Sequence, residues 1–170
     1  MSDRRAVFPR LRQSAPRNYL CDVDGAEIFN QSPFPGIADD GKSVTQLWEQ
    51  PRQDPVHGQA VLVDGYVYAA SHQKANGRWS CVDLRTGKLA WEAPGVGKGG
   101  SVTFADGLLY CYSEDGTVGL MRPSPEKCEV VSSFKVLEGD GPHWAHLVVA
   151  QGRLFLRHGM ALMCYALKTP

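Results

Sequence analysis

The sequence has no excess of either charge, no long apolar run and no secretory signal. Its 170 residues include 18 Lys and Arg and 18 Asp and Glu, so the formal net charge is zero. This balance does not predict a nucleic-acid partner or binding to an acidic membrane surface. Every apolar run is shorter than the roughly 18 residues that a membrane-spanning helix requires. The first twenty residues are basic but lack the continuous apolar core of a secretory signal, so we expect neither a span nor a leader.

Paired cysteines are also absent. The chain has no Cys-x-x-Cys and no adjacent Cys-Cys, which excludes a zinc ribbon and a disulfide framework. The five cysteines are widely spaced, at positions 21, 81, 111, 128 and 164. We expect most of them to be small buried residues in strands, because free cysteine behaves as a small hydrophobe.

Glycine is abundant, and it separates short apolar stretches. The chain has 18 Gly and 11 Pro, and 43% of its residues are hydrophobic, enough for one domain with a sizeable core. Many short strands with frequent turns predict an all-β protein.

Two landmarks recur with one period. The aromatic residues Trp48, Trp91 and Phe134 are each 43 residues apart. Glycines at positions 65, 107 and 152, each between apolar runs, are 42 and 45 residues apart, and a weaker copy places Gly25 a further 40 residues upstream. A period of about 40–45 residues in short strands is typical of propeller blades with four strands each. We therefore predict that Trp48, Trp91 and Phe134 lie between consecutive blades and hold them together.

The turn residues agree with this period. Asp-Gly between two apolar runs predicts a type I′ hairpin, because both central residues need positive φ. Such pairs would join the first strand of a blade to the second at Asp24-Gly25, Asp64-Gly65 and Asp106-Gly107. Later turns of the blades are predicted at Asn76-Gly77, Asp115-Gly116 and Thr86-Gly87, the last organised by side-chain hydrogen bonds from Asp83 to Thr86.

The resulting prediction is a partial β-propeller of about three to four four-stranded antiparallel blades. One blade occupies about 59–92, with strands near 59–63, 66–71, 78–84 and 88–92. The next occupies about 100–136, with strands near 100–105, 108–113, 117–121 and 129–136. The last, about 145–168, has three strands near 145–150, 153–157 and 161–167. Residues 44–49 are predicted as the fourth strand of a blade, which could complete the three-stranded one. Residues 42–170 thus form the repeats, and residues 1–41 an N-terminal arm or a degenerate blade.

The stretches "GYVYAAS" (65–71) and "CVDLRTGKLAW" (81–91) resemble the PQQ-like (quinoprotein-like) β-propeller repeat. In the WD40 repeat a tryptophan directly precedes the aspartate, where this chain has Val82. The resemblance implies one of two kinds of protein: alcohol dehydrogenases that hold pyrroloquinoline quinone and calcium, or non-enzymatic scaffolds such as an outer-membrane assembly lipoprotein. The dehydrogenases carry a Cys-Cys pair that this chain lacks.

We therefore expect a non-catalytic scaffold that binds a protein partner, or that self-associates through open blade edges, without a cofactor. The alternative is a fragment or subunit of a PQQ-dependent, polyvinyl-alcohol-like dehydrogenase, with quinone and calcium. The resemblance also implies a periplasmic or extracytoplasmic location, whereas the sequence shows no export signal. A truncated or mis-started reading frame would explain both this and the small number of blades.

Candidate ligand-binding residues lie in the segments that enter the first strand of each blade. These segments, "DPVHGQ", "VGKGGS" and "GPHWAH", would meet at one mouth of the axial channel. Their polar, cationic and aromatic side chains are His57, Lys98, His143, Trp144 and His146. They predict a site for a small anionic or polar ligand or an acidic peptide; metal binding by the three histidines and a purely structural filling of the channel are the alternatives. His72 and His158 are predicted in surface loops.

Overall fold

A computed structural model describes residues 47–56, 58–72 and 76–167, and this part of the chain is all-β. It contains three antiparallel sheets in which neighbouring strands follow one another in sequence. Blade 1 comprises β1 (Val61–Val63), β2 (Tyr66–Ala70), β3 (Trp79–Asp83) and β4 (Leu89–Ala93). Blade 2 comprises β5 (Ser101–Ala105), β6 (Leu108–Tyr112), β7 (Thr117–Arg122) and β8 (Glu129–Lys135). Blade 3 comprises β9 (Val148–Ala150), β10 (Arg153–His158) and β11 (Ala161–Ala166).

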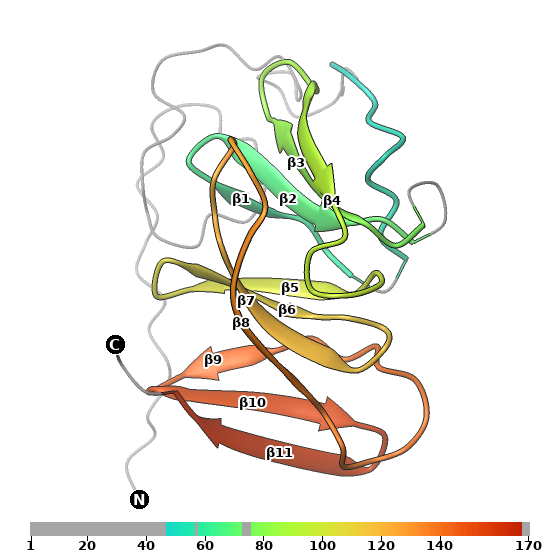
Figure 1. Ribbon diagram of the computed structural model, residues 1–170, viewed down its shortest axis with the longest axis vertical. Coiled ribbons are helices and arrows are strands. Elements are labelled where there is room, and N and C mark those ends of the chain that lie inside the picture. Colours follow the sequence, from blue (N-terminus) through green and yellow to red (C-terminus); the bar gives the residue numbers. More distant parts are fainter. Residues whose placement is uncertain (1–46, 57, 73–75, 168–170) are drawn as a thin grey trace, which may run out of the picture.

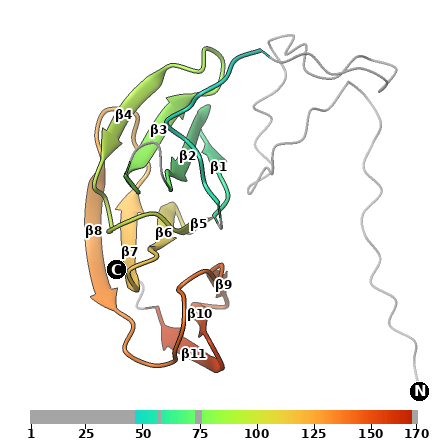
Figure 2. The ribbon, with the colours of Figure 1, turned by 90° about the vertical axis from the view of Figure 1, so that its right-hand side faces the viewer.

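The three sheets are stacked one on another, with blade 2 in the middle (Figure 1). Seen from the side they form an arc, in which the first strands β1, β5 and β9 lie along one side and β4 and β8 along the other (Figure 2). Strand β5 contacts both β1 and β9, so the first strands form the inner, axial side of the arc. This is the arrangement of consecutive blades in a β-propeller, and the predicted fold class is confirmed.

The eleven strands predicted from residue 59 onward are found with small shifts at their ends. The strand predicted at residues 44–49 is wrong for its described part, since residues 47–50 have no strand structure. The contacts of Trp48 explain this. Its ring packs against Leu62, Val67 and Leu84 on the face of blade 1 that points away from blade 2, called the outer face of blade 1 below, and does not extend a sheet edge. Residues 1–41 and the Asp24-Gly25 turn lie outside the described residues.

The hairpins between the first two strands of each blade have the predicted geometry. Asp64 and Asp106 have φ of 48° and 49°, and the glycines that follow them have φ of 79° and 73°. Blade 3 uses Gln151 at φ 52°, followed by Gly152 at φ 67°. Both central residues of each turn therefore lie in the left-handed region that a type I′ turn requires. Glutamine at this position is less common, which is why the turn of blade 3 was found from its glycine alone.

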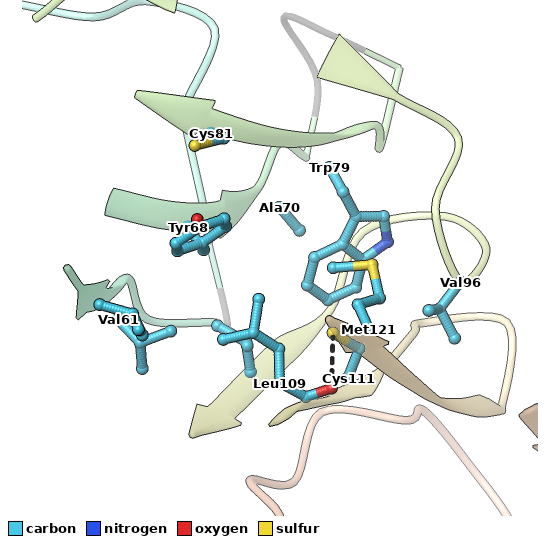
Figure 3. Packing of buried hydrophobic residues seen from close by; sticks show 11 residues of the cluster. Val61, Tyr68, Ala70, Trp79, Cys81, Val96, Leu109, Cys111 and Met121 are labelled. Carbon is cyan, nitrogen blue, oxygen red and sulfur yellow. Dashed lines mark hydrogen bonds between the residues drawn. The ribbon is translucent and has the colours of Figure 1, made fainter. Parts of the chain in front are cut away.

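The core between blades 1 and 2 is built around Trp79, whose side chain is 1% exposed. Its ring lies against Met121 of blade 2, and its indole nitrogen donates to the carbonyl oxygen of Gly97 at 3.0 Å. Leu109 and Cys111 of blade 2 approach from the other sheet (Figure 3). Burying an aromatic ring of this size removes about 150–250 Å² from water. Trp79 thus fixes blade 1 to blade 2, although no repeat in the sequence marks it.

A second core joins blades 2 and 3. Tyr110, Tyr112 and Val118 of blade 2 pack against Leu154 and Leu156 of β10. Side chains of β10 alternate, so that these two leucines face blade 2 while their neighbours face away.

The cysteines partly follow the prediction. Cys81 and Cys111 are buried in β3 and β6, whereas Cys164 is exposed in β11 and Cys128 is half-buried just before β8. All four are free thiols, and burial raises the pKa of Cys81 to about 11. Cys21 lies outside the described residues.

Candidate functional site

Lys98 lies at an open cavity of about 490 Å³ between blades 1 and 2. The cavity is also lined by His72 and Asn76, from the end of β2 and the turn that follows, and by Glu114 and Asp115, from the turn between β6 and β7. The His72 ring nitrogen lies 3.1 Å from Glu114 Oε1, and the Glu114 amide donates to the Lys98 carbonyl oxygen at 3.0 Å. The wall therefore combines one lysine and one histidine with two carboxylates.

Asp115 is held as a carboxylate by its neighbours. Burial acts to raise its pKa, but hydrogen bonds from Ser113, Thr117 and Lys135 outweigh burial and lower it. Lys135 Nζ lies 3.3 Å from Asp115 Oδ1. The charge of Asp115 is thus already neutralised by a lysine of β8, and its role in the cavity wall is to fix the turn.

His143 is directed into the protein and not into this cavity. Its Nδ1 is hydrogen-bonded to the hydroxyl group of Tyr112, and its ring is stacked on that of His158 with centroids 3.8 Å apart. Burial lowers the pKa of His143, and the charge of His158 lowers it further. We infer a neutral imidazole whose Nδ1 accepts the proton of Tyr112.

His158, on which the His143 ring is stacked, was predicted in a surface loop, and that prediction is wrong. It is the last residue of β10 and is 7% exposed. Its Nδ1 lies 2.7 Å from the carbonyl oxygen of Glu138, and its Nε2 lies 2.8 Å from that of Gly141. Carbonyl oxygens accept hydrogen bonds, so both contacts are satisfied only when both ring nitrogens carry protons. The hydrogen bonds to Gly141 and Glu138 accordingly raise the pKa of His158.

The ring of His158 fixes the connector between blades 2 and 3. Its two carbonyl partners belong to the segment that runs from β8 to β9, residues 136–147. The sequence did contain a signal for this position, since Leu154, Leu156 and His158 share one face of a strand with period two. Two of these residues are core leucines, and the same alternation would have placed the third residue inward.

The five predicted ligand-binding residues have different surroundings. Lys98 and His143 lie on two sides of the turn at residues 114–116, because Asp115 borders the cavity and a side chain at Gly116 would touch the His143 ring. Trp144 is 50% exposed and His146 is exposed, both in the connector that His158 holds. His57 lies outside the described residues. A shared ligand site of these residues stays a prediction.

A metal-ligand set and a Cys-Cys pair are what the resemblance implies for a site of quinone and calcium. Among residues 47–56, 58–72 and 76–167 no group of three His, Cys, Asp or Glu side chains is placed to hold a metal ion. The sequence also has no Cys-Cys pair. In the same part of the chain, no helix is long and apolar enough to cross a membrane.

The recurring aromatic residues make equivalent contacts at the blade junctions. Trp48 donates its indole N–H to the Leu84 carbonyl oxygen at 2.9 Å, and Trp91 donates to that of Ser124 at 2.7 Å. Both acceptors lie just after the third strand of the next sheet. Phe134, without a donor, contacts the Tyr165 ring with centroids 5.0 Å apart.

The segment of Trp48 covers the outer face of blade 1. Gln50 Nε2 donates to the Gly87 carbonyl oxygen at 2.9 Å, and Arg52 forms a two-pronged ion pair with Glu92 of β4 at 2.6 and 2.7 Å. Beneath the Trp48 ring, Leu62 and Val82 are buried.

The face of blade 3 that points away from blade 2 is uncovered in the described structure. It carries Val148, which is 55% exposed, Leu162, which is 73% exposed, and the exposed Cys164. The cross-strand pairs Phe155 with Val148 and Phe155 with Cys164 place these side chains on one face, opposite the face that packs on blade 2. This surface, with Phe155 at its centre, is called the outer face of blade 3 below.

Comparison with known proteins finds similar folds at low sequence identity. No protein-family model and no curated protein matches the sequence. One similar solved structure is the computationally designed Ika8 protein, with a TM-score of 0.47 and 15% identity over 63% of this chain and 32% of that chain. Quinohemoprotein alcohol dehydrogenase from Comamonas testosteroni has a TM-score of 0.47 and 20% identity over 62% of this chain and 17% of that chain. BamB from Moraxella catarrhalis has a TM-score of 0.42 and 16% identity over 63% of this chain and 41% of that chain. The matched part of this chain thus spans less than half the length of each of these proteins.

Proposed function

We propose that this chain is a PQQ-like repeat module that acts as a scaffold and binds another polypeptide on the outer face of blade 3, without chemistry of its own. The observation that carries the proposal is the exposure of Leu162 and Val148 on a sheet face that the propeller architecture normally covers. Contiguous exposed apolar surface on a folded protein marks an interaction site.

Blade 1 shows what such a face requires. There blade 2 covers the equivalent surface, and Tyr68, the third residue after the hairpin glycine as Phe155 is in blade 3, is 2% exposed. On blade 3 the matching position Phe155 remains only half-buried. A partner that covers this face would bury the same kind of surface that blade 2 buries on blade 1.

Another polypeptide is a better partner than a second copy of this chain. A head-to-tail stack of copies would need the outer face of blade 1, which Trp48 already occupies. A two-fold dimer through blade 3 would bring Arg153 and Arg157 of both copies together, because these residues lie on the outer face of blade 3. Like charges facing each other oppose association. We therefore expect a monomer by light scattering at tens of micromolar.

Site-specific photo-cross-linking tests the proposal. A photoreactive residue at Leu162 should form adducts with a polypeptide from the native source, and an excess of unlabelled chain should suppress them. The same group at Val131, which is 47% exposed on β8, is the matched control and should form few adducts. An unlabelled Leu162→Asp chain should compete poorly. Equal labelling at the two positions, or none at Leu162, would overturn the scaffold function.

A second measurement separates the scaffold from a dehydrogenase. Pyrroloquinoline quinone with calcium should produce no saturable absorbance change when titrated into the chain. Addition of an alcohol and a redox dye should produce no reduction. Saturable binding together with dye reduction would replace the scaffold proposal with the dehydrogenase alternative.

A further inference from the structure

We propose that β11 accepts an extended segment of a partner as the fourth strand of blade 3, and that this segment carries acidic residues four positions apart on its outer face. This inference rests on the proposed scaffold function and specifies the chemistry of the partner. It is carried by three features of blade 3: a free strand edge, an apolar space beside it and two arginines that no acidic residue of the blade neutralises.

The edge of β11 has no neighbour in the described structure. In blades 1 and 2 the third strand pairs with a fourth, β3 with β4 and β7 with β8, whereas β11 pairs with β10 alone. Along an antiparallel edge strand, every second residue directs its N–H and C=O away from the sheet. These groups form a template on which an extended peptide can add by main-chain hydrogen bonds.

An apolar space lies where the blade 2–3 junction is incomplete. Phe134 of β8 touches Tyr165 of β11 but remains 39% exposed. Beside it is a small cavity of about 50 Å³, lined by Leu154, Leu167 and residues of β7 and β8. The inward side chains of an added strand would meet this apolar surface, so they are expected to be apolar.

The outer face supplies the charge preference. Arg157 is paired with Leu162 and Arg153 with Ala166, so both guanidinium groups lie on the same face as the outward side chains of β11. Both arginines are exposed, and residues 141–170 contain no Asp or Glu. Arg157 Nε donates to the Gly159 carbonyl oxygen at 3.0 Å, which leaves the other guanidinium donors for a partner.

Strand geometry predicts the spacing of the acidic residues on the added strand. An added strand would lie two strand spacings from β10, about 9–10 Å, which an arginine and a glutamate can bridge from opposite sides. Because Arg153 and Arg157 are four residues apart on β10, their partners should also be four residues apart on the added strand. The residue of the added strand midway between the two acidic residues would lie beside Cys164, in line with Phe155, so we expect an apolar side chain there.

Peptide binding to the full chain tests this. The probe is a nine-residue fluorescent peptide of valine and threonine with glutamate at its third and seventh positions, and binding is followed by anisotropy. The expected result is saturable binding that weakens with salt, as for exposed ion pairs. A peptide with lysine at both positions should bind roughly tenfold more weakly or not at all.

A charge swap identifies the arginines. The double variant Arg153→Glu, Arg157→Glu should lose the acidic peptide and gain the lysine peptide. Arg85→Glu, an exposed change on blade 1, is the matched control and should leave both affinities unchanged. Because the swap gains a ligand as well as losing one, a misfolded variant cannot imitate it.

Two further measurements test the strand pairing and the competing occupants. Methylation of alternate peptide nitrogens in the register that faces β11 should abolish binding, because it removes the main-chain donors. Amide hydrogen exchange at those residues of 162–166 whose N–H points away from β10 should be fast in the free chain and slow with peptide. Slow exchange in the free chain would mean that another segment of this chain already pairs with β11, and would overturn the proposal.

The outcomes separate this inference from the scaffold function. If a peptide with glutamine in place of glutamate binds equally well, the acidic preference is wrong while the scaffold stands. If no peptide binds but Leu162 still cross-links to a partner, the strand-addition mode is wrong and the scaffold again stands. If no peptide binds and Leu162 gives no adducts, both fail.

Discussion

The indole nitrogen of Trp91 donates a hydrogen bond of 2.7 Å to the carbonyl oxygen of Ser124, across the junction between blades 1 and 2. The ring also lies 6.1 Å from that of Tyr68 in its own blade. One side chain thus joins a strand of one sheet to the turn of the next. The contact between Trp48 and Leu84 repeats it one blade earlier.

Replacing Trp91 should separate the contribution of the ring from that of its hydrogen bond. Trp91→Ala should lower the free energy of unfolding by roughly 3–5 kcal/mol, since it removes a large aromatic side chain from a packed junction. Trp91→Phe keeps a ring but leaves the Ser124 carbonyl oxygen without this donor. The lost hydrogen bond should lower the free energy of unfolding by about 1 kcal/mol beyond the effect of the smaller ring. Urea unfolding measures both values. Ala90→Ser, at an exposed position of the same strand, should change stability by less than about 0.5 kcal/mol. A Trp91→Ala chain as stable as this control would contradict the junction role.

Phe134 offers the reverse experiment, a gain of stability. Leu167 is the equivalent of Leu84, because the amide of each donates to the glycine of its first hairpin, Gly152 or Gly65. Phe134→Trp should therefore place an indole N–H near the Leu167 carbonyl oxygen and stabilise the chain by about 0.5–1.5 kcal/mol. The midpoint of urea unfolding should rise. Phe134→Leu, which loses the ring contact with Tyr165, should lower it. If Phe134→Trp leaves the midpoint at or below that of the unchanged chain, the three junctions are not equivalent.

Gly87 and Gly65 form a matched pair for testing the Trp48 contact. Both have positive φ, 69° and 79°, so alanine at either position should cost about 1–2 kcal/mol in backbone strain. A Cβ at Gly87 would also lie 2.6 Å from the Trp48 ring, whereas none of the described neighbours lies within 4 Å of one at Gly65. Gly87→Ala should therefore destabilise the chain more than Gly65→Ala, by about 1 kcal/mol or more. The excess should vanish in a Trp48→Ala background. Equal costs for the two glycines in the unchanged chain would show that Trp48 does not occupy this place.

The fold was predictable because its signals are local and repeated. Asp64 and Asp106 specify their hairpins through backbone conformation alone, and the period of the glycines placed the strands around them. Trp79 had no such signal, since its importance comes from Met121 and Gly97 in another part of the chain. The strand expected at residues 44–49 failed for a related reason. An apolar stretch beside an aromatic residue can pair with a sheet edge or cover a sheet face, and the sequence does not distinguish the two.

The candidate site was less predictable than the fold. Proximity to the axial connectors selected Lys98 and His143, but it could not show that His143 would stack on His158 and hydrogen-bond to Tyr112. Such pairings depend on side chains from three segments that are 15 to 46 positions apart in the sequence. The alternation of Leu154, Leu156 and His158 was the one local clue that the last of these residues points inward.

The two stacked histidines should titrate in opposite directions from their ordinary value near 6.5. The carbonyl oxygens of Gly141 and Glu138 raise the pKa of His158, and the charge of Asp140 raises it further. Burial and the charges of His158 and Lys135 lower the pKa of His143, against a raising effect of Asp115. NMR titration of the imidazole resonances should place the midpoint of His158 above, and that of His143 below, the unfolded-state value.

The sign of each shift fixes its effect on stability. A raised pKa for His158 stabilises the fold fully below the unfolded-state value, and this contribution disappears as the pH rises through the folded pKa. The lowered pKa of His143 has the opposite effect, since stability is lost as the pH falls from the unfolded-state value through the folded pKa. His158→Gln should therefore destabilise the chain most below the unfolded-state value near 6.5, by urea unfolding, and progressively less as the pH rises through the folded pKa of His158.

The His158→Gln variant also tests the stacking of the His143 and His158 rings. Without the cationic ring beside it, His143 should bind its proton more readily, so its NMR midpoint should move upward in His158→Gln. An unmoved His143 midpoint would mean that the charge of His158 does not act on His143 across the 3.8 Å stack. A stability difference independent of pH would mean that His158 holds the connector as a neutral ring.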